Sequence, residues 1–438
     1  MTMARGMAAT APRTVERATE ALRWIARAGV FVHVASLPIS MAGMQAGFAI
    51  AAIALVLLRV AGVPVWRRSL LDLPILAFVG AALLSQLLAF AWMGGDAFLW
   101  KTLLSPLVIV SALGLDPARA RRDALRLLGV WAVAAMVPAI LAWPQYYTGF
   151  DLLHALGLRK EAVHTTVQLY RERYNALGLF SAHTRLAHAL LAPVCVLAAV
   201  APVAAKGARR TLAPIVLAAI AAAIVLTFAR SAWYGLVAAG AVLSLFAGGK
   251  RAVAGFAALA VAGALLVSLH PGVRTRFASS FDPSRNQDRK GIWQVCADVA
   301  KEHPWTGVGF GNLPVAAREK FDGNAIIGKM GEKTKRRCHN AFFTSLAEGG
   351  PLLFAASIFL IAGPAWSFLR LRRRTDRLGA AACAGALAML AAMFVNSLVH
   401  DPLYASEAGF AFGFALAAAA LVAATPTPGS DAEAPAAA

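Results

Sequence analysis

Apolar stretches long enough to cross a membrane recur along the whole chain. Each holds about 18–25 residues, the length that a helix needs to span the hydrocarbon core of a bilayer. The strict apolar–polar alternation of a membrane β-barrel is missing. The pattern therefore predicts an all-α, polytopic helical membrane protein with about 12 transmembrane helices. The expected spans are residues 24–41, 43–61, 70–93, 97–114, 124–147, 184–204, 211–228, 231–247, 252–269, 341–369, 379–399 and 403–424.

The composition agrees with this class. Hydrophobic residue types make up 59% of the chain and charged types 15%, whereas soluble domains carry roughly 25% charged residues. This difference excludes an ordinary water-soluble protein. We expect a single integral membrane domain over residues 1–438, with a disordered tail at 425–438, where the residues are small and polar.

Basic residues predict the orientation of the spans. A basic cluster follows every even-numbered span from the second to the tenth, whereas the short turns at 94–96 and 400–402 have no Lys or Arg. By the positive-inside rule, both termini and the tail are then cytoplasmic. The basic leader before the first span could pass for a signal peptide, but further spans follow at once, which favours an uncleaved first helix. The clusters are Arg59, Arg67 and Arg68; Arg119, Arg121, Arg122 and Arg126; Lys206, Arg209 and Arg210; Lys250 and Arg251; and the run RLRRRTDR at 370–377.

Two connections on the external side are long, at 148–183 and at 270–338. Loops of this length in a compact membrane domain are usually functional or disordered. The second lies between spans 9 and 10 and contains DRKGIWQVCADVAKEHP, a helical pattern with one apolar face. From Arg274 to Arg337 it has 13 Lys and Arg against 7 Asp and Glu. This surplus indicates either a solvated face or a site that attracts an anionic substrate at the outer surface.

Candidate site residues lie where charged side chains meet the predicted spans. Arg230 in LTFARSAWYG and Arg185 in FSAHTRLAHALLAP stand at span ends. An arginine there either has a function or is an interfacial anchor. His339 follows two cations, Arg336 and Arg337, at the start of an apolar helix.

A second pair of candidates stands on the same external side. His400 and Asp401 lie between spans 11 and 12, in HDPLY. They are either a buried structural pair or a pair that orients a substrate.

The cysteines and the known phosphate and metal motifs add little. Cys195 and Cys383 fall inside spans, whereas Cys296 and Cys338 fall outside the membrane, where a disulfide is open to them but not required. The chain has no Walker-type phosphate loop, no His/Cys/Asp cluster with metal spacing and no G-x-S-x-G elbow. We therefore expect no metal and no cofactor.

Three segments, in this order, resemble the O-antigen ligase family, which also includes O-antigen polymerases and pilin oligosaccharyltransferases. The resemblance covers about residues 220–360, and the layout of spans extends it weakly over the rest. The segments are LTFARSAWYG at 226–235, RKGIWQVCADVAKEHPWTGVGFGN at 289–312, and HNAFFTSLAEGGPLL at 339–353.

The resemblance implies a lipid-carrier glycosyltransferase of the GT-C type in the bacterial inner membrane, with its active site facing the periplasm. Its donor would be O-antigen linked to undecaprenyl pyrophosphate, and its acceptor a sugar hydroxyl of lipid A–core. Partners would be these lipids and the membrane, with no nucleic acid. Direct displacement with one base would invert the anomeric centre.

The resemblance also assigns roles to residues. Arg230 and Arg289 match the family's arginines and would hold the pyrophosphate, for which the guanidinium fork is suited; we group Arg185 with them. His339 matches the family's histidine and would be the general base. Arg285, one helical turn before Arg289, stays open as an alternative. Further candidates for substrate binding or orientation are Arg336, Arg337, His400 and Asp401.

Other functions remain open at this point. An O-antigen polymerase or a pilin or protein oligosaccharyltransferase would use nearly the same chemistry on another acceptor. The cations before His339 favour the ligase, because its acceptor is a polyanionic core lipid. A secondary transporter would suit the number of spans, but the two halves of the chain show no repeat and no paired broken helices.

Overall fold

The structure is a computed structural model that describes residues 13–89, 98–162, 166–167, 170–282, 287–324 and 337–424. These residues form 17 α-helices and one two-stranded sheet, so the predicted all-α class is confirmed. The predicted tail at 425–438 lies outside the described residues.

Each of the twelve expected spans corresponds to a helix. Nine of the described helices are long and apolar enough to cross a membrane, α3 and α4 are apolar but shorter, and α1 is not among them. The chain is thus a polytopic helical protein, while the count of twelve stays a prediction. The helices are α1 (Arg13–Ser36), α2 (Met41–Val60), α3 (Asp72–Leu88), α4 (Phe98–Gly114), α5 (Pro117–Thr148), α7 (His183–Ala204), α8 (Ala208–Leu226), α9 (Arg230–Ala247), α10 (Gly249–Leu269), α15 (Ala341–Leu371), α16 (Arg377–Ser397) and α17 (Ser406–Ala424).

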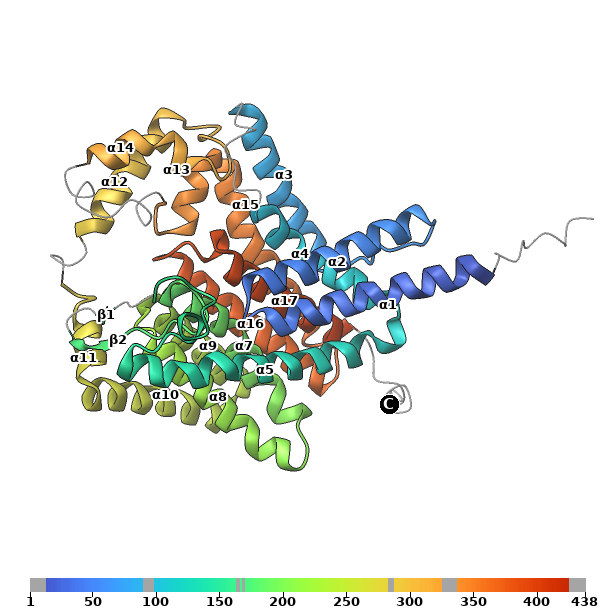
Figure 1. Ribbon diagram of the computed structural model, residues 1–438, viewed down its shortest axis with the longest axis horizontal. Helices are drawn as coiled ribbons and strands as arrows, with labels where there is room; N and C mark the ends of the chain where they lie inside the picture. The colour runs from blue at the N-terminus through green and yellow to red at the C-terminus, as the bar shows by residue number, and fades with distance from the viewer. Residues whose placement is uncertain are drawn as a thin grey trace, which may run out of the picture.

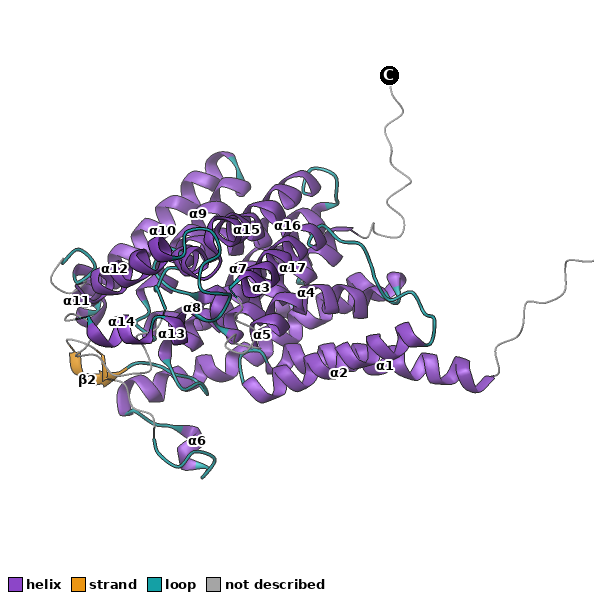
Figure 2. Ribbon diagram, turned by 90° about the horizontal axis from the view of Figure 1, so that it is seen from above, coloured by secondary structure: helices purple, strands orange, loops and turns teal. Residues whose placement is uncertain are grey.

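The first helix differs most from its expected span. Helix α1 begins at Arg13 and ends at Ser36, whereas the apolar pattern placed the span at 24–41. A turn follows it, and the Ser40 side chain then caps α2 by accepting a hydrogen bond from the Gly43 amide. The α1–α2 hairpin extends away from the other helices (Figures 1 and 2). The Ser40 cap, and not the hydropathy pattern, therefore marks the start of the second helix.

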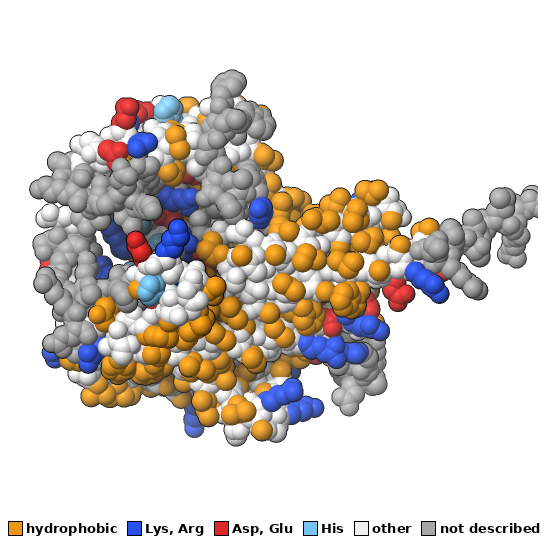
Figure 3. Space-filling view, viewed as in Figure 1, with side chains coloured by type: hydrophobic (Ala, Val, Ile, Leu, Met, Phe, Trp, Pro, Cys, Tyr) orange, Lys and Arg blue, Asp and Glu red, His pale blue; other side chains and the backbone are white. Residues whose placement is uncertain are grey.

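The later helices form the centre of the bundle. Helix α17 is buried along nearly its whole length, and α16 packs against α7, α9 and α17. In contrast, α10 has no buried residue, and it packs on α9 and α11 (Pro271–Ala278). Apolar side chains cover much of the surface seen in Figure 3, as expected of a protein surrounded by lipid.

Helix α15 is broken, although its sequence predicted one continuous span. Gly349 has φ −142° and Gly350 has φ +62°, and Pro351 begins the second half. Glycine adopts this left-handed conformation at no steric cost, and proline suits the first turn of a helix. The first half, which begins two residues after His339, is therefore a short helix of its own.

Both long connections are folded where the structure describes them. The first contains α6 (Leu152–Ala155) and an antiparallel pair, β1 (Thr166–Val167) and β2 (Tyr170–Tyr174). The second contains α11, α12 (Gln287–Glu302), α13 (Leu313–Ala316) and α14 (Arg318–Gly323). The labels of β1, β2 and α11 to α14 lie on the left of Figure 1. This part of the structure holds the candidate site.

Candidate active site

The turn between α8 and α9 places Arg230 as the first residue of α9. Phe228 in this turn has φ +54°, and the Thr227 hydroxyl accepts a hydrogen bond from the Ala229 amide at 3.2 Å. The Phe228 carbonyl accepts a hydrogen bond from Nε of Arg276, on α11, at 3.4 Å. The turn thus brings two arginines from different elements to the same end of the bundle.

Hydrogen bonds join the start of α9 to the end of α11. Nη1 of Arg230 donates to the Ser280 hydroxyl at 3.2 Å and to the Ser279 hydroxyl at 3.4 Å. The Tyr234 hydroxyl, one turn further along α9, donates to Ser280 at 2.8 Å. Among the described residues, no carboxylate forms an ion pair with Arg230 or with Arg289 on α12.

Arg230, Arg276 and Arg289 form an arginine cluster. Burial, together with the charges of Arg230 and Arg289, lowers the pKa of Arg276 to about 10. Burial and the charge of Arg230 also lower the pKa of Arg289. Arg276 thus stays protonated at neutral pH, and the cluster concentrates positive charge that a bound anion would stabilise. Lys and Arg side chains are visible in a recess on this part of the surface in Figure 3.

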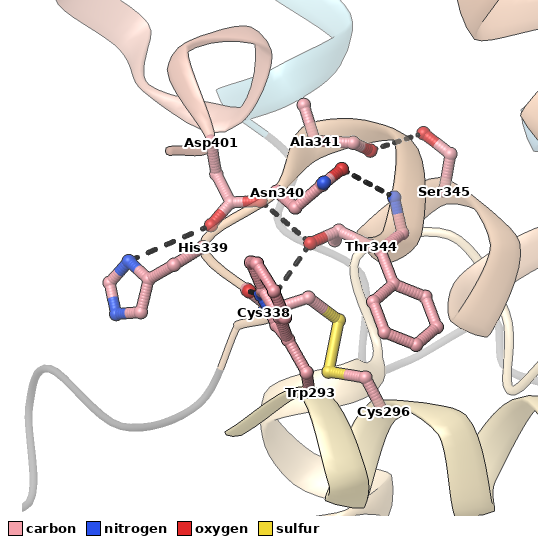
Figure 4. Close-up of a disulfide and its surroundings, with 10 residues drawn as sticks. Trp293, Cys296, Cys338, His339, Asn340, Ala341, Thr344, Ser345 and Asp401 are labelled. Carbon is pink, nitrogen blue, oxygen red and sulfur yellow. Dashed lines mark hydrogen bonds and ion pairs between the residues drawn. A yellow bond between two sulfur atoms is a disulfide. The ribbon is translucent and has the colours of Figure 1, made fainter. Parts of the chain in front are cut away.

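His339 lies between the helices of the second long connection and the start of α15. Its backbone is left-handed, with φ +49°, and its side chain is 28% exposed. Nδ1 lies 4.0 Å from Oδ2 of Asp401, and the Thr344 hydroxyl donates to Oδ1 of Asp401 at 2.6 Å. Figure 4 shows Asp401 held between Thr344 and His339. The carboxylate of Asp401 thus faces Nδ1 of the His339 ring.

His400 connects His339 with the arginine cluster. Its ring centre lies 5.4 Å from that of His339 and 4.9 Å from that of His188, on α7. Burial, followed by the charges of His188, His339 and Arg289, lowers the pKa of His400 well below its usual value. His400 is therefore neutral at physiological pH, with the His339 ring beside it and the charge of Arg289 acting on it.

Cys296 and Cys338 form a disulfide, which the sequence had left open. It joins α12 to the residue before His339 (Figure 4). The apolar face predicted for this helix is confirmed, since Ile292, Val295, Cys296 and Val299 are buried in one cluster.

The glycine-rich turn at 307–312 packs on the break in α15. The Gly309 amide donates to the Glu348 carbonyl, and the Gly311 amide donates to Oε2 of Glu348, both at 2.8 Å. The Ser85 hydroxyl, on α3, donates to the same carbonyl at 2.7 Å. A Cβ atom at Gly307 would collide with the backbone of Glu348. Sequence reasoning missed Glu348, which lies fully buried in an apolar run.

Two of the predicted residues have structural partners. Nη1 of Arg185 lies 3.2 Å from Oε1 of Glu407, a buried residue of α17, so its charge is compensated within the bundle. Nη1 of Arg337 donates to the Tyr404 carbonyl at 2.8 Å, and its guanidinium lies 5.1 Å from the centre of the Tyr404 ring.

Two further predicted residues and the prediction on metal binding remain to be placed. Arg285 and Arg336 lie outside the described residues. In the part of the chain that the structure describes, no group of three or more His, Cys, Asp or Glu is arranged to hold a metal ion.

Arg276 was not predicted. It stands two residues after Arg274 in the same polar segment, and no motif separates the two. The fold does separate them, because Arg274 is exposed and Arg276 is partly buried beside Arg230.

Comparison with known proteins assigns this region to a family. Residues 215–358 match the profile of the O-antigen ligase family, and this stretch contains the arginine cluster, the disulfide and His339. No curated protein matches the chain. The region that holds the candidate site is thus similar to the O-antigen ligase family.

Proposed function

We propose that this protein transfers O-antigen polysaccharide from undecaprenyl pyrophosphate to a sugar hydroxyl of lipid A–core, at the periplasmic face of the inner membrane. The observation that carries the proposal is that His400 lies beside His339 and also feels the charge of Arg289, a member of the arginine cluster. The arginine cluster suits the pyrophosphate leaving group of such a reaction, and His339 suits its nucleophile, the sugar hydroxyl. The family domain supports ligase- or polymerase-type glycosyl transfer in general.

The arginine cluster would bind the pyrophosphate of the donor. Planar guanidinium groups grip phosphate oxygens through paired hydrogen bonds and keep their charge after partial burial. Arg230 also stands at the first turn of α9, where the helix dipole favours an anion. The negative charge that develops on the leaving pyrophosphate is then stabilised by groups already in place.

His339 would act as the general base on the acceptor. Asp401 lies beside Nδ1, so an Nδ1–H tautomer leaves Nε2 as the proton acceptor. The acceptor oxygen attacks the anomeric carbon as its proton passes to Nε2. The bond from that carbon to the pyrophosphate oxygen breaks, and the lipid pyrophosphate leaves as an anion. A single displacement of this kind inverts the anomeric centre.

The location of the site outside the cytoplasm has two supports. The basic clusters after the even-numbered spans predict that this end faces outward. Disulfides form and persist in oxidising compartments such as the bacterial periplasm, and the Cys296–Cys338 disulfide lies at this end. Because no ATP is available there, a lipid-activated donor suits the reaction.

The test is transfer in vitro with purified protein in lipid nanodiscs, given a synthetic undecaprenyl-pyrophosphate glycan and rough lipopolysaccharide. Neither nucleotide nor metal is added. Wild type should form glycosylated lipopolysaccharide. His339→Gln keeps the size and hydrogen bonding of the side chain but accepts no proton at neutral pH, so its kcat should fall about 10²–10⁴-fold.

Two results would contradict the proposal. Absence of product with wild type would exclude this activity, and near-normal kcat in His339→Gln would exclude His339 as the base. Supplying a second lipid-linked glycan in place of lipopolysaccharide tests the polymerase alternative, in which the glycan grows on the lipid carrier.

A further inference from the structure

Every polar group of Cys338 is engaged. Its Sγ is bonded to Cys296, its carbonyl accepts a hydrogen bond from Nε1 of Trp293 at 2.9 Å, and its amide donates to the Thr344 hydroxyl at 3.3 Å. Cys296 and Cys338 are both fully buried. Figure 4 shows Trp293 and Cys296 approaching Cys338 from the same helix, α12. The residue before His339 is thus fixed from three directions.

The residue after His339 is fixed as well. Oδ1 of Asn340 accepts from the Phe343 amide at 3.0 Å, which caps α15, and its Nδ2 donates to the Leu398 carbonyl at 3.0 Å. A left-handed backbone is unfavourable for a non-glycine residue and persists only where the surroundings impose it. At His339, the fixed residues on either side, Cys338 and Asn340, impose this backbone conformation.

The disulfide also links the two halves of the site. Arg289 lies on α12 about two helical turns before Cys296, and His339 follows Cys338 directly. A covalent bond therefore ties the helix that carries a donor-binding arginine to the segment that carries the base. The two cysteines are separated by 42 residues in the sequence, so the disulfide ties together segments that are remote along the chain.

We propose that the Cys296–Cys338 disulfide is a positioning element for His339, which sets the histidine against the arginine cluster once the protein is oxidised. This inference rests on the proposed function. Formation of the bond removes two protons and two electrons from the two thiols, and a disulfide oxidant of the external compartment accepts them. The complete site then exists only after these segments have crossed the membrane.

The test compares wild type with Cys296→Ala/Cys338→Ala in the same transfer assay. The matched control is Cys195→Ala/Cys383→Ala, which removes the two free cysteines and keeps the disulfide. We expect kcat of the first variant to fall tenfold or more, since a displacement of about 1 Å can cost about 10²-fold in rate. The donor KM should change less than threefold, because Arg230 and Arg276 lie on α9 and α11, outside the tether. The control should match wild type in both constants.

Reduction of folded wild type covers the case in which the variant does not fold. A water-soluble phosphine opens the bond to two thiols and is itself oxidised to the phosphine oxide, with oxygen from water. Thiols counted by mass spectrometry report the opened fraction. Transfer should fall in proportion to that fraction and return after reoxidation with oxidised glutathione. A disulfide that serves only global stability would lower Tm and the yield of folded protein without this reversible loss of kcat.

The outcomes separate the two proposals. Wild-type transfer that is insensitive both to the Ala pair and to opening of the bond would overturn the positioning role and leave the proposed function standing. A donor KM that rises as much as kcat falls would also overturn it, because the tether would then serve donor binding. No transfer by the oxidised wild type would overturn the proposed function and this inference with it.

Discussion

At the scale of single residues, the positive charge of the site depends on how three arginines from three elements are placed. Arg276 is at their centre, since burial and the charges of both Arg230 and Arg289 lower its pKa. Such mutual repulsion is unfavourable in the absence of an anion and is relieved when one binds. A residue in this position should affect the binding of a pyrophosphate more than the chemical step.

We therefore predict that Arg276→Lys raises the donor KM about tenfold with a smaller change in kcat. Lysine keeps the charge but loses the planar fork, and one charge-assisted hydrogen bond contributes about 1.5–3 kcal/mol. The matched control is Arg274→Lys, two residues earlier on α11 and exposed, which should stay within twofold of wild type. Titration of the lipid donor in the transfer assay measures both. If the donor KM of Arg276→Lys stays as close to wild type as that of the control, the positive charge at this position is sufficient and the planar fork is not needed.

Sequence reasoning could find those site residues that stand in a distinctive local setting. Arg230 interrupts two apolar helices, and His339 stands at the start of one, so both were predicted. Arg276 could not be found in this way, because its neighbours in the sequence are equally polar and its partners are remote. The role of Arg185 in phosphate binding stays a prediction, and its ion pair with Glu407, more than two hundred residues away, could not be found from the sequence.

At the scale of elements, the break in α15 connects the site to the second long connection. Gly350 adopts φ +62°, and a Cβ atom there would collide with the Trp305 carbonyl oxygen. The glycine-rich turn thereby packs directly on the broken helix. Two amides of this turn donate hydrogen bonds to Glu348, one to its carbonyl oxygen and one to its carboxylate. The short first half of α15 is held at one end by this contact and at the other by the Asn340 cap.

Gly350→Ala should therefore destabilise the protein and lower its transfer activity. The left-handed backbone alone costs alanine about 1–2 kcal/mol, and the collision with Trp305 adds to that cost. The control is Gly323→Ala at the end of α14, where no atom lies within 4 Å of the added Cβ and φ is not positive. Thermal unfolding in detergent should show a lower Tm for Gly350→Ala and an unchanged Tm for the control. An unchanged Tm in both variants would mean that the glycine-rich turn can move away from the added Cβ atom without loss of stability.

The sequence predicted where the helices lie but not this break. Hydropathy records only that residues 341–369 are apolar, and small residues such as Gly349 and Gly350 do not interrupt that signal. The break follows from a contact with residues some forty positions earlier, which a local pattern does not contain. For the same reason, the helical face of α12 was predicted and its disulfide was not.

At the scale of the whole molecule, the apolar pattern does not distinguish helices that face lipid from helices that face other helices. Helix α10 has no buried residue and α17 is buried nearly throughout, yet both are equally suited to a span by length and composition. In a membrane, lipid tails and neighbouring side chains are both apolar, so hydropathy carries little information on packing. Charge asymmetry carries a different kind of information, which concerns the whole bundle: its orientation.

The orientation can be tested on a chain that is already suited to thiol labelling. All four native cysteines are inaccessible, because Cys195 and Cys383 are buried and Cys296 and Cys338 are bonded to each other. A single introduced cysteine at an exposed position then reports its own side of the membrane. Suitable positions are Lys160 and Lys301 in the two long connections and Arg373 in the basic run after α15.

We expect a membrane-impermeant maleimide to label Lys160→Cys and Lys301→Cys in intact spheroplasts, and to label Arg373→Cys only after the membrane is permeabilised. The physical reason is the positive-inside rule, which keeps the short basic connections cytoplasmic and exempts long loops. Wild type provides the unlabelled background. The reverse pattern would place the arginine cluster and His339 in the cytoplasm. There, the Cys296–Cys338 disulfide would be kept reduced and a lipopolysaccharide acceptor would be out of reach, so periplasmic transfer could not be the function of this site.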